Sequence, residues 1–262
     1  KRTPLADFRS QARGGIGSKA SASRDQDFIE YVHQASMHST MMFFTEMGRL
    51  YWLKVYEIPE GNKQSKGRAI QNIINLQKGD KVRAFINVKG LNDAEYVQNH
   101  YLIFATKNGL MKKTTLEAYS RPRANGIIAL SLREGDELIG VRLTDGESEM
   151  LIASYNGKVV RFPENTIRPM GRSASGVRAI KLDEDSQDRA VGMICVEKGS
   201  DKTVLVISDK GFGKRTALDD ENGEPIYRIT NRGGKGVKTM NLTDKTGNLI
   251  GLEAVNDEQD LM

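Results

Sequence analysis

A repeated pattern constrains the fold of this 262-residue chain more than any other feature of its sequence. A Lys/Arg-Thr motif with similar flanks occurs at residues 1–5, 112–116 and 214–218, and divergent copies occur at 52–58 and 160–164. Repeats with periods of tens of residues are typical of solenoids and propellers, in which one supersecondary unit recurs. The repeat therefore predicts an array of similar units.

Each copy is followed by a short loop that is rich in glycine and in Lys or Arg. The loops end at Gly17, Gly67, Gly126, Gly176 and Gly236, with spacings of 50, 59, 50 and 60 residues. Apolar runs that flank the motif and the loop predict strands at 41–44, 101–105, 150–153 and 204–207, and at 27–32, 82–86, 138–141, 191–196 and 249–252. Each unit is expected to contain a strand, a glycine turn, a strand, the basic loop, a strand, a connector and a final strand.

These elements indicate an all-β fold. Asn108-Gly109 and Asn156-Gly157 predict two-residue hairpin turns, and no amphipathic helix of 11 or more residues is evident. Four-stranded units repeated around an axis indicate a propeller-like array of about five to six blades. We expect a single domain over 1–262, with truncated ends: a partial unit at 1–38, full units at about 39–91, 92–146, 147–199 and 200–256, and the start of another at 257–262.

Composition argues against several classes of function. The single cysteine, Cys195, excludes a disulfide framework and a cysteine-based zinc site. The three histidines have no metal-like spacing, and no nucleophile or phosphate-loop motif occurs. We therefore expect no catalytic residue, metal or cofactor in this chain, and we interpret acidic pairs such as Asp136-Glu137 as solvated turns. No apolar run approaches a membrane span and no signal peptide is evident, which favours the cytoplasm.

The basic loops are the candidate functional site. Glycine allows backbone amides to approach a phosphate, and Arg adds a bidentate donor. Because the loops lack interleaved aromatic residues, they suit the backbone of duplex DNA better than stacked single strands. The alternative is that they are only solvated turns. The predicted DNA-binding residues are Arg13, Gly14, Gly15, Gly17, Lys19, Lys66, Arg68, Arg121, Arg123, Arg172, Arg178, Arg232, Gly233, Gly234, Lys235 and Lys238.

The first of these loops also carries a family resemblance. Residues 11–17, Gln-Ala-Arg-Gly-Gly-Ile-Gly, resemble the gyrase A box, Gln-Arg-Arg-Gly-Gly-Lys-Gly, of the C-terminal domain of the DNA gyrase A subunit, which adds Gln11 to the predicted site. Residues 54–60, 157–162 and 211–216 are also similar to that family. The resemblance therefore covers essentially the whole chain.

The resemblance implies a β-pinwheel, a propeller variant in which neighbouring blades exchange strands, with six blades in the intact domain. It implies that the domain wraps duplex DNA so that the holoenzyme introduces negative supercoils. The expected partners are duplex DNA, the remainder of the gyrase A subunit, and the gyrase B subunit, near the bacterial nucleoid. The catalytic tyrosine and the ATPase are expected outside this chain.

The chain departs from the family box at Ala12 and Ile16, where the family has basic residues. These departures favour an alternative, the corresponding domain of the topoisomerase IV A subunit, in which the box is degraded. The remaining box glycines and the well-kept units favour gyrase. A protein-interaction propeller of the WD40 kind is a third hypothesis, disfavoured because the Trp-Asp signature is missing.

Overall fold

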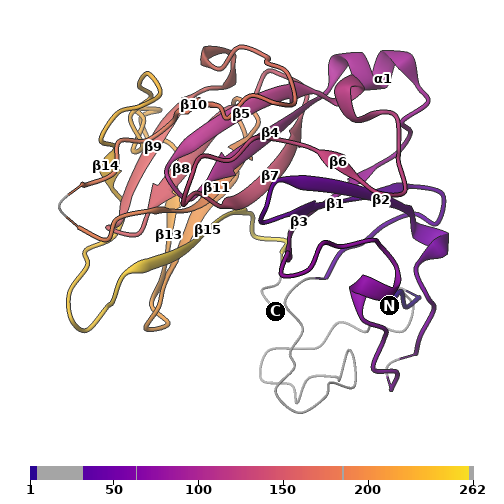
Figure 1. The fold of residues 1–262 in the computed structure, drawn as a ribbon. Coiled ribbons are helices and arrows are strands. Elements are labelled where there is room, and N and C mark those ends of the chain that lie inside the picture. The colour runs from indigo at the N-terminus through magenta and orange to yellow at the C-terminus, as the bar shows by residue number, and fades with distance from the viewer. Residues whose placement is uncertain (5–31, 63, 185, 260–262) are drawn as a thin grey trace.

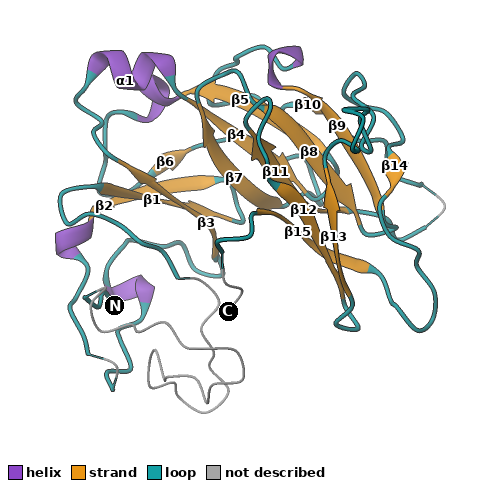
Figure 2. Cartoon of the chain, turned by 180° about the vertical axis from the view of Figure 1, so that it is seen from behind, coloured by secondary structure: helices purple, strands orange, loops and turns teal. Residues whose placement is uncertain are grey.

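The computed structural model describes residues 1–4, 32–62, 64–184 and 186–259. This part of the chain forms four antiparallel sheets, which confirms the all-β prediction (Figures 1 and 2). From one edge to the other, the first sheet contains β3 (Val82–Val88), β1 (Thr40–Thr45), β2 (Arg49–Lys54) and β6 (Ile127–Ile128). The second contains β7 (Leu138–Thr144), β4 (Tyr101–Thr106), β5 (Leu110–Thr115) and β10 (Val177–Arg178).

The third and fourth sheets follow the same order. The third contains β11 (Ala190–Val196), β8 (Glu149–Ser154), β9 (Lys158–Pro163) and β14 (Val237–Lys238). The fourth contains β15 (Leu249–Val255), β12 (Thr203–Ser208) and β13 (Gly213–Ala217). The eight predicted strands from residue 41 onward are all present, whereas the segment predicted at 27–32 lies outside the described residues except for Val32.

The short outer strands are exchanged between units. β6, β10 and β14 each come directly after the basic loop of one unit, but they pair with β2, β5 and β9 of the unit before. Each four-stranded sheet is therefore completed by the next stretch of chain. This exchange is the pinwheel arrangement that the family resemblance implied.

Alternation along the central strands explains how the sheets stack. Side chains of a strand point to opposite faces with a period of two. Leu102 and Phe104 of β4 thus pack in one core with β1, whereas Ile103 and Ala105 pack in another core with β8. Leu151 and Ala153 of β8 contribute in the same way to a third core with β12. Because both faces of a central strand are covered, these strands have almost continuous apolar sequences.

The sheets converge at one edge and diverge at the other. Strands β3, β7, β11 and β15 contact one another in succession and form the inner edge of the array. In the first three sheets the outer edge is formed by β6, β10 and β14, the strands that follow the basic loops (Figure 1). Strand exchange therefore places the basic loops on the outer rim, which is the geometric condition for a belt of cations.

Short helices occupy the connectors. They are α1 (Ala94–Asn99) and the 3-10 helices η2 (Val55–Glu57), η3 (Ile70–Asn72), η4 (Leu116–Tyr119) and η5 (Glu164–Thr166). Asn108-Gly109 and Asn156-Gly157 do form hairpin turns, but three residues separate the strands instead of two. Gly109 has φ +75° and its amide donates to Thr106 O at 3.0 Å, so the left-handed conformation that closes this turn falls on the glycine.

Candidate nucleic-acid interface

We call four basic loops of the described chain rim loops 1 (66–69), 2 (121–128), 3 (171–178) and 4 (231–238). Loops 2 to 4 lead into the exchanged strands of the outer edge, and loop 1 has the same place in its repeat. The glycine before each exchanged strand is required by close packing. A Cβ on Gly126, Gly176 or Gly236 would lie 2.6, 2.5 or 2.6 Å from the carbonyl oxygen of Leu50, Met111 or Val159, respectively. All three glycines also have positive φ. Each of these glycines therefore marks the point at which a loop packs against the preceding sheet.

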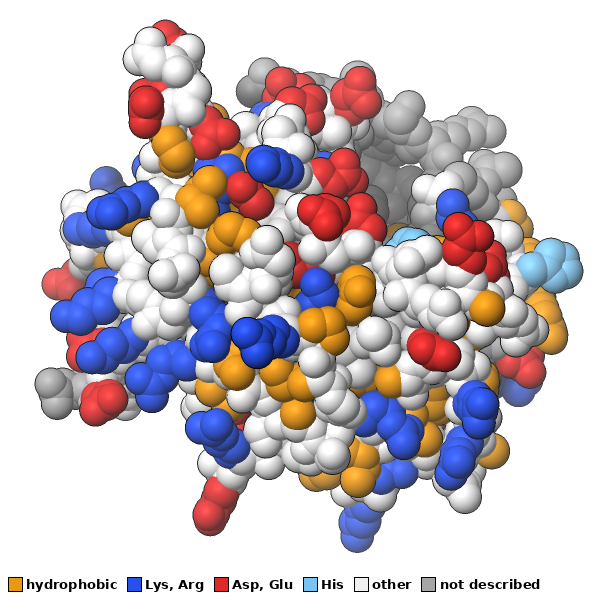
Figure 3. Space-filling view, turned by 90° about the horizontal axis from the view of Figure 1, so that it is seen from above, with side chains coloured by type: hydrophobic (Ala, Val, Ile, Leu, Met, Phe, Trp, Pro, Cys, Tyr) orange, Lys and Arg blue, Asp and Glu red, His pale blue; other side chains and the backbone are white. Residues whose placement is uncertain are grey.

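The cations of the rim loops are exposed and unpaired. Lys and Arg at nine predicted positions are solvent-exposed, and none forms an ion pair within the described part of the chain. These positions are Lys66, Arg68, Arg121, Arg123, Arg172, Arg178, Arg232, Lys235 and Lys238. In the view of Figure 3, most blue side chains lie in the lower half and along the left side, while most red ones lie above. An unpaired exposed cation is free to neutralise a phosphate.

Successive rim loops contact one another. The Ser131 amide, just after rim loop 2, donates to Ala174 O of rim loop 3 at 3.4 Å. The Gly233 amide of rim loop 4 donates to Ala179 O at 2.7 Å, and Arg232 Nη1 donates to Arg178 O at 3.2 Å. These contacts join loops 2, 3 and 4 into one band along the rim.

Bonds of this kind change the interpretation of two predicted residues, Gly233 and Gly234. The sequence suggested that Gly233 presents a free amide to an anion, but that amide is already bonded to Ala179 O. Gly234 forms a β-bridge with Ile180, and its carbonyl accepts from the Lys181 amide at 2.8 Å. These two glycines hold the loop against the neighbouring unit, so Arg232, Lys235 and Lys238 remain as the candidate phosphate ligands of rim loop 4.

The predicted residues of the first loop, Gln11, Arg13, Gly14, Gly15, Gly17 and Lys19, lie outside the described residues. Two of the predicted arginines that are described, Arg123 of rim loop 2 and Arg172 of rim loop 3, line one open groove of about 560 Å³. Arg49 from the start of β2 lines it as well, although the sequence did not single this residue out. Arg49 precedes the motif copy at 52–58 on the same strand and lies outside the basic loops, so the sequence pattern gave no signal for it.

A second set of cations lies at the junctions between units, and the sequence did not identify its role. Lys113, Arg161 and Arg2 occupy the same position of the repeated motif. Lys113 Nζ is 2.7 Å from Glu164 Oε1, and both side chains are buried. The other two pairs, at the same kind of junction, are Arg161 with Asp219 at 2.8 Å and Arg2 with Glu60 at 3.0 Å. Each pair joins the motif of one unit to the next unit.

The acidic turns differ from the solvated pairs that the sequence suggested. Asp136 is only 8% exposed, and its Oδ1 accepts from the amides of Asn108 and Glu137, both at 2.9 Å. Asp80 and Asp188 hold their own hairpins in the same way. In these three units an aspartate therefore clamps the hairpin turn to the inner strand.

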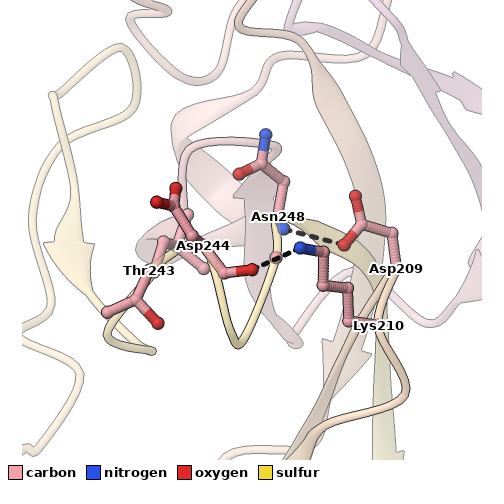
Figure 4. A pocket seen from close by; sticks show the side chains of 7 residues that line it. Asp209, Lys210, Thr243, Asp244 and Asn248 are labelled. Carbon is pink, nitrogen blue, oxygen red and sulfur yellow. Dashed lines mark hydrogen bonds between the residues drawn. The ribbon is translucent and has the colours of Figure 1, made fainter.

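The fourth unit reverses this arrangement and leaves a hollow of about 330 Å³ (Figure 4). Gly247 stands where the other units have aspartate, and Asp209 of the hairpin accepts from the Asn248 amide at 3.0 Å instead. A Cβ on Gly247 would collide with Asp209 Oδ1. Lys210 Nζ donates to Asp244 O across the hollow. The side chains of Asp209 and Lys210 are thus bonded to the backbone of the adjacent turn, and we assign no ligand to this hollow.

Comparisons with known proteins identify the family of this chain. The sequence model of a protein family, described as the DNA gyrase C-terminal domain, beta-propeller, matches residues 1–36, 39–89, 100–145, 148–197 and 202–256. The chain belongs to the DNA gyrase C-terminal domain family. It is 42% identical over 262 residues to the DNA gyrase A subunit of Staphylococcus aureus strain NCTC 8325 / PS 47. The match covers the whole chain but 28% of that relative, so the chain corresponds to part of a longer protein.

Solved structures of this family have the same fold. The C-terminal domain of DNA topoisomerase IV aligns with a TM-score of 0.75 at 24% identity, covering 98% of this chain and 74% of that one. A DNA gyrase A C-terminal domain aligns with a TM-score of 0.66 at 22% identity, covering 85% and 68%. At these identities the structural matches support the β-pinwheel fold and do not distinguish the two enzymes.

Metal and membrane sites are not found in the described ranges. No group of three or more His, Cys, Asp or Glu side chains is placed to hold a metal ion there. None of the helices within that part of the chain is long and apolar enough to cross a membrane.

Proposed function

We propose that this chain is a non-catalytic DNA-wrapping domain of the DNA gyrase A subunit. Duplex DNA would bind along the outer rim and bend around it, so that the holoenzyme introduces negative supercoils. The observation that carries the proposal is the contrast in pairing: the nine rim-loop cations have no acidic partner among the described residues, whereas the junction cations do. Charges kept unpaired on one curved edge are suited to a polyanion.

The mode of binding follows from the elements available. The rim presents loops and two-residue strands, and in the described ranges it offers no helix that could enter a major groove. Contacts to phosphates position a protein on DNA without reading its sequence. The domain is therefore proposed to bind duplex DNA with little sequence preference.

The remaining assignments come from the family. The catalytic tyrosine and the ATPase are proposed to lie in other parts of the holoenzyme. The proposed partners are the rest of the gyrase A subunit, together with the gyrase B subunit. The enzyme would act in the bacterial cytoplasm, at the nucleoid. No cofactor is assigned to this chain.

The second candidate is the corresponding domain of the topoisomerase IV A subunit. Ala12 and Ile16 remove two cations from the first box, and a topoisomerase IV domain is among the structural matches. The 42% identity to a gyrase A subunit over the whole chain favours gyrase. The two candidates differ in whether the holoenzyme supercoils relaxed DNA, and a supercoiling assay separates them.

The salt dependence of DNA binding tests the proposed function directly. Each neutralised phosphate contributes roughly −0.9 to the slope of log K against log salt concentration, so about six to eight rim contacts predict a slope steeper than about −4. Fluorescence anisotropy on short duplexes of two unrelated sequences would measure it. A flat salt response, or a strong preference for one sequence, would contradict the proposal.

A further inference from the structure

The groove between rim loops 2 and 3 combines features that set it apart on the described rim. It is about 560 Å³ in volume and lies where rim loops 2 and 3 meet, with Arg123 contributed by one loop and Arg172 and Ser173 by the other. Arg49 of β2 and Ile128 also line it. Three arginines, one from each of three successive repeat units, thus line one open groove.

We propose that this groove is a seat for one backbone phosphate of duplex DNA, and that Lys112 is the positioning residue that holds rim loops 2 and 3 at the spacing the seat needs. The inference rests on the DNA-binding function proposed above. It goes further because it separates cations that share one phosphate from cations that act singly along the rim.

The arginines of the groove are arranged to accept an anion. None of the three forms an ion pair with a carboxylate among the described residues. Arg49 is held in place because its Nη2 donates to Asn125 O at 2.9 Å and its Nε donates to Tyr51 Oη at 3.2 Å. Ile128 is 55% exposed, so an apolar side chain flanks the charges. A pre-oriented guanidinium gains more from a phosphate because less side-chain freedom is lost on binding.

Lys112 connects the two chain segments that border this groove. It lies on β5 and is only 1% exposed. Its Nζ donates to Ala129 O, just after rim loop 2, at 2.5 Å and to Arg172 O of rim loop 3 at 2.6 Å. One ammonium group therefore sets the distance between the chain segments that carry Arg123 and Arg172. Lysine is almost never fully buried unless its charge is satisfied, because burial of an unpaired charge costs free energy. The two bonds to carbonyl groups offset part of this cost and hold the two segments together.

The equivalent position of the repeat does not have this role everywhere. In the next unit it is Val160, which cannot bond to a carbonyl group and instead packs in an apolar core. In the fourth unit Lys214 Nζ donates to Thr239 O alone, at 3.2 Å. At the junction between units 2 and 3 the lysine bridges two loops, and there the groove with three arginines is found.

The charge state of Lys112 offers a signature that a purely structural residue would not give. Burial, with a contribution from the nearby positive charge of Arg172, lowers the pKa of Lys112 to about 7. The other groups against it are neutral: Tyr119, whose hydroxyl donates to the same Ala129 O at 2.7 Å, and the ring of Phe104. A phosphate seated above Lys112 would favour its charged form, so DNA binding near pH 7 should be accompanied by proton uptake.

The experiment compares matched pairs of arginines in the full 262-residue chain. Arg123→Ala with Arg172→Ala removes two cations from the groove. Arg121→Ala with Arg178→Ala removes two cations from the same two loops but outside the groove lining. Affinity is measured by anisotropy on a ~40-bp duplex at fixed low salt, with each single variant included. The groove pair should lose about tenfold or more, with strong coupling between its two members, and the control pair should lose a few-fold additively.

Lys112→Met supplies the second readout, measured as affinity between pH 6 and pH 8.5. The wild-type chain should bind several-fold more tightly at pH 6 than at pH 8.5, and the variant should lose most of this difference. Both chains contain the same histidines, so a contribution of these residues to the pH dependence of affinity cancels between the wild-type chain and Lys112→Met. Equal effects of the two arginine pairs without coupling would overturn the inference while leaving the proposed function intact. Absence of salt-dependent duplex binding by the wild-type chain would overturn both, and the arginine pairs decide the inference even if Lys112→Met does not fold.

Discussion

The junctions between units and the rim loops are both rich in Lys and Arg, but they use these charges differently. At the junctions, Lys113 and Arg161 are buried and bonded to Glu164, Glu149 and Asp219. On the rim, the cations are exposed and no acidic group of the described chain lies within ion-pair distance. A buried charge must be satisfied inside the protein, whereas an exposed one retains its ability to bind an external anion. In these repeats, the cation of the motif therefore stabilises the contact between units, whereas the cations of the following loop remain able to bind an anion.

The largest expected difference between the two regions is in stability. Lys113→Met leaves Glu164, whose side chain is fully buried, without its countercharge, although Thr144 Oγ1 and the Ser148 amide still donate to it. Breaking a buried pair in this way costs about 3–5 kcal/mol. Arg178→Met on the rim should change the free energy of unfolding by no more than about 0.5 kcal/mol. Urea unfolding of both variants measures the comparison, and similar losses would mean that the junction pair has no special role.

The exchanged strands provide the second test, because their glycines are needed where the rim meets the sheet. Gly176 has φ +98° and a Cβ there would lie 2.5 Å from Met111 O. Gly199 also has a positive φ, +75°, but nothing lies within 4 Å of its Cβ position. Gly199→Ala therefore measures backbone strain alone, about 1 kcal/mol, and Gly176→Ala adds the clash, for a total of about 2–4 kcal/mol. Thermal unfolding of the two variants should differ clearly; equal losses would show that β10 moves away without penalty.

Lys112 lies between the two regions, and its contribution should depend on pH. Its pKa is about 7 in the folded chain and near 10.5 when unfolded, so unfolding takes up a proton between these values. The free energy of unfolding therefore rises with pH in this window, by at most about 1.4 kcal/mol per pH unit. Below the window Lys112 is charged in both states and adds no pH dependence. Relative to Lys112→Met, the wild-type chain should gain stability from pH 7 to pH 9. A constant difference between the two would contradict the burial of this charge.

The sequence predicted those features that depend on local patterns. Apolar runs such as 101–105 and 150–153 became central strands because both of their faces are covered by neighbouring sheets. The turn glycines were found because positive φ is a local requirement of the chain. The exchange of β10 with the preceding unit came only from the family resemblance, since a two-residue strand carries no periodic signal of its own.

The pairing of charges could not be predicted in the same way. Lys113 of β5 and Arg178 of β10 are both basic residues on strands, and only the fold brings Glu164 to the first and leaves the second exposed. The exchange between Gly247 and Asp209 also depends on contacts between segments far apart in the sequence, because the aspartate fills the space that the missing side chain leaves. Partners that are distant in sequence decided these roles, and the composition of a loop does not contain that information.

The smallest expected effect concerns the end of the rim band. Replacing Arg232 and Lys235 by Ala removes two candidate phosphate contacts from rim loop 4, while Gly233 and Gly234 still hold the loop through Ala179 and Lys181. Stability should change little, since the bonds of Arg232 to Thr166 O and Arg178 O are exposed and both 3.2 Å long. Much of the affinity should remain, because the other rim loops keep their cations.

The bend of bound DNA should nevertheless decrease in this variant. Bending a 20–30 bp site costs on the order of 1–6 kcal/mol, so the duplex follows the rim only as far as phosphate contacts hold it. Losing the contacts at one end allows the far segment to straighten while the remaining loops keep the duplex bound. Energy transfer between the ends of a ~40-bp duplex at fixed low salt measures the end-to-end distance, with Arg142→Ala as a control outside the rim loops. A longer distance with nearly unchanged affinity would establish that rim loop 4 acts on the path of the DNA, whereas equal distances would assign its cations to the solvated surface and restrict the belt to rim loops 1 to 3.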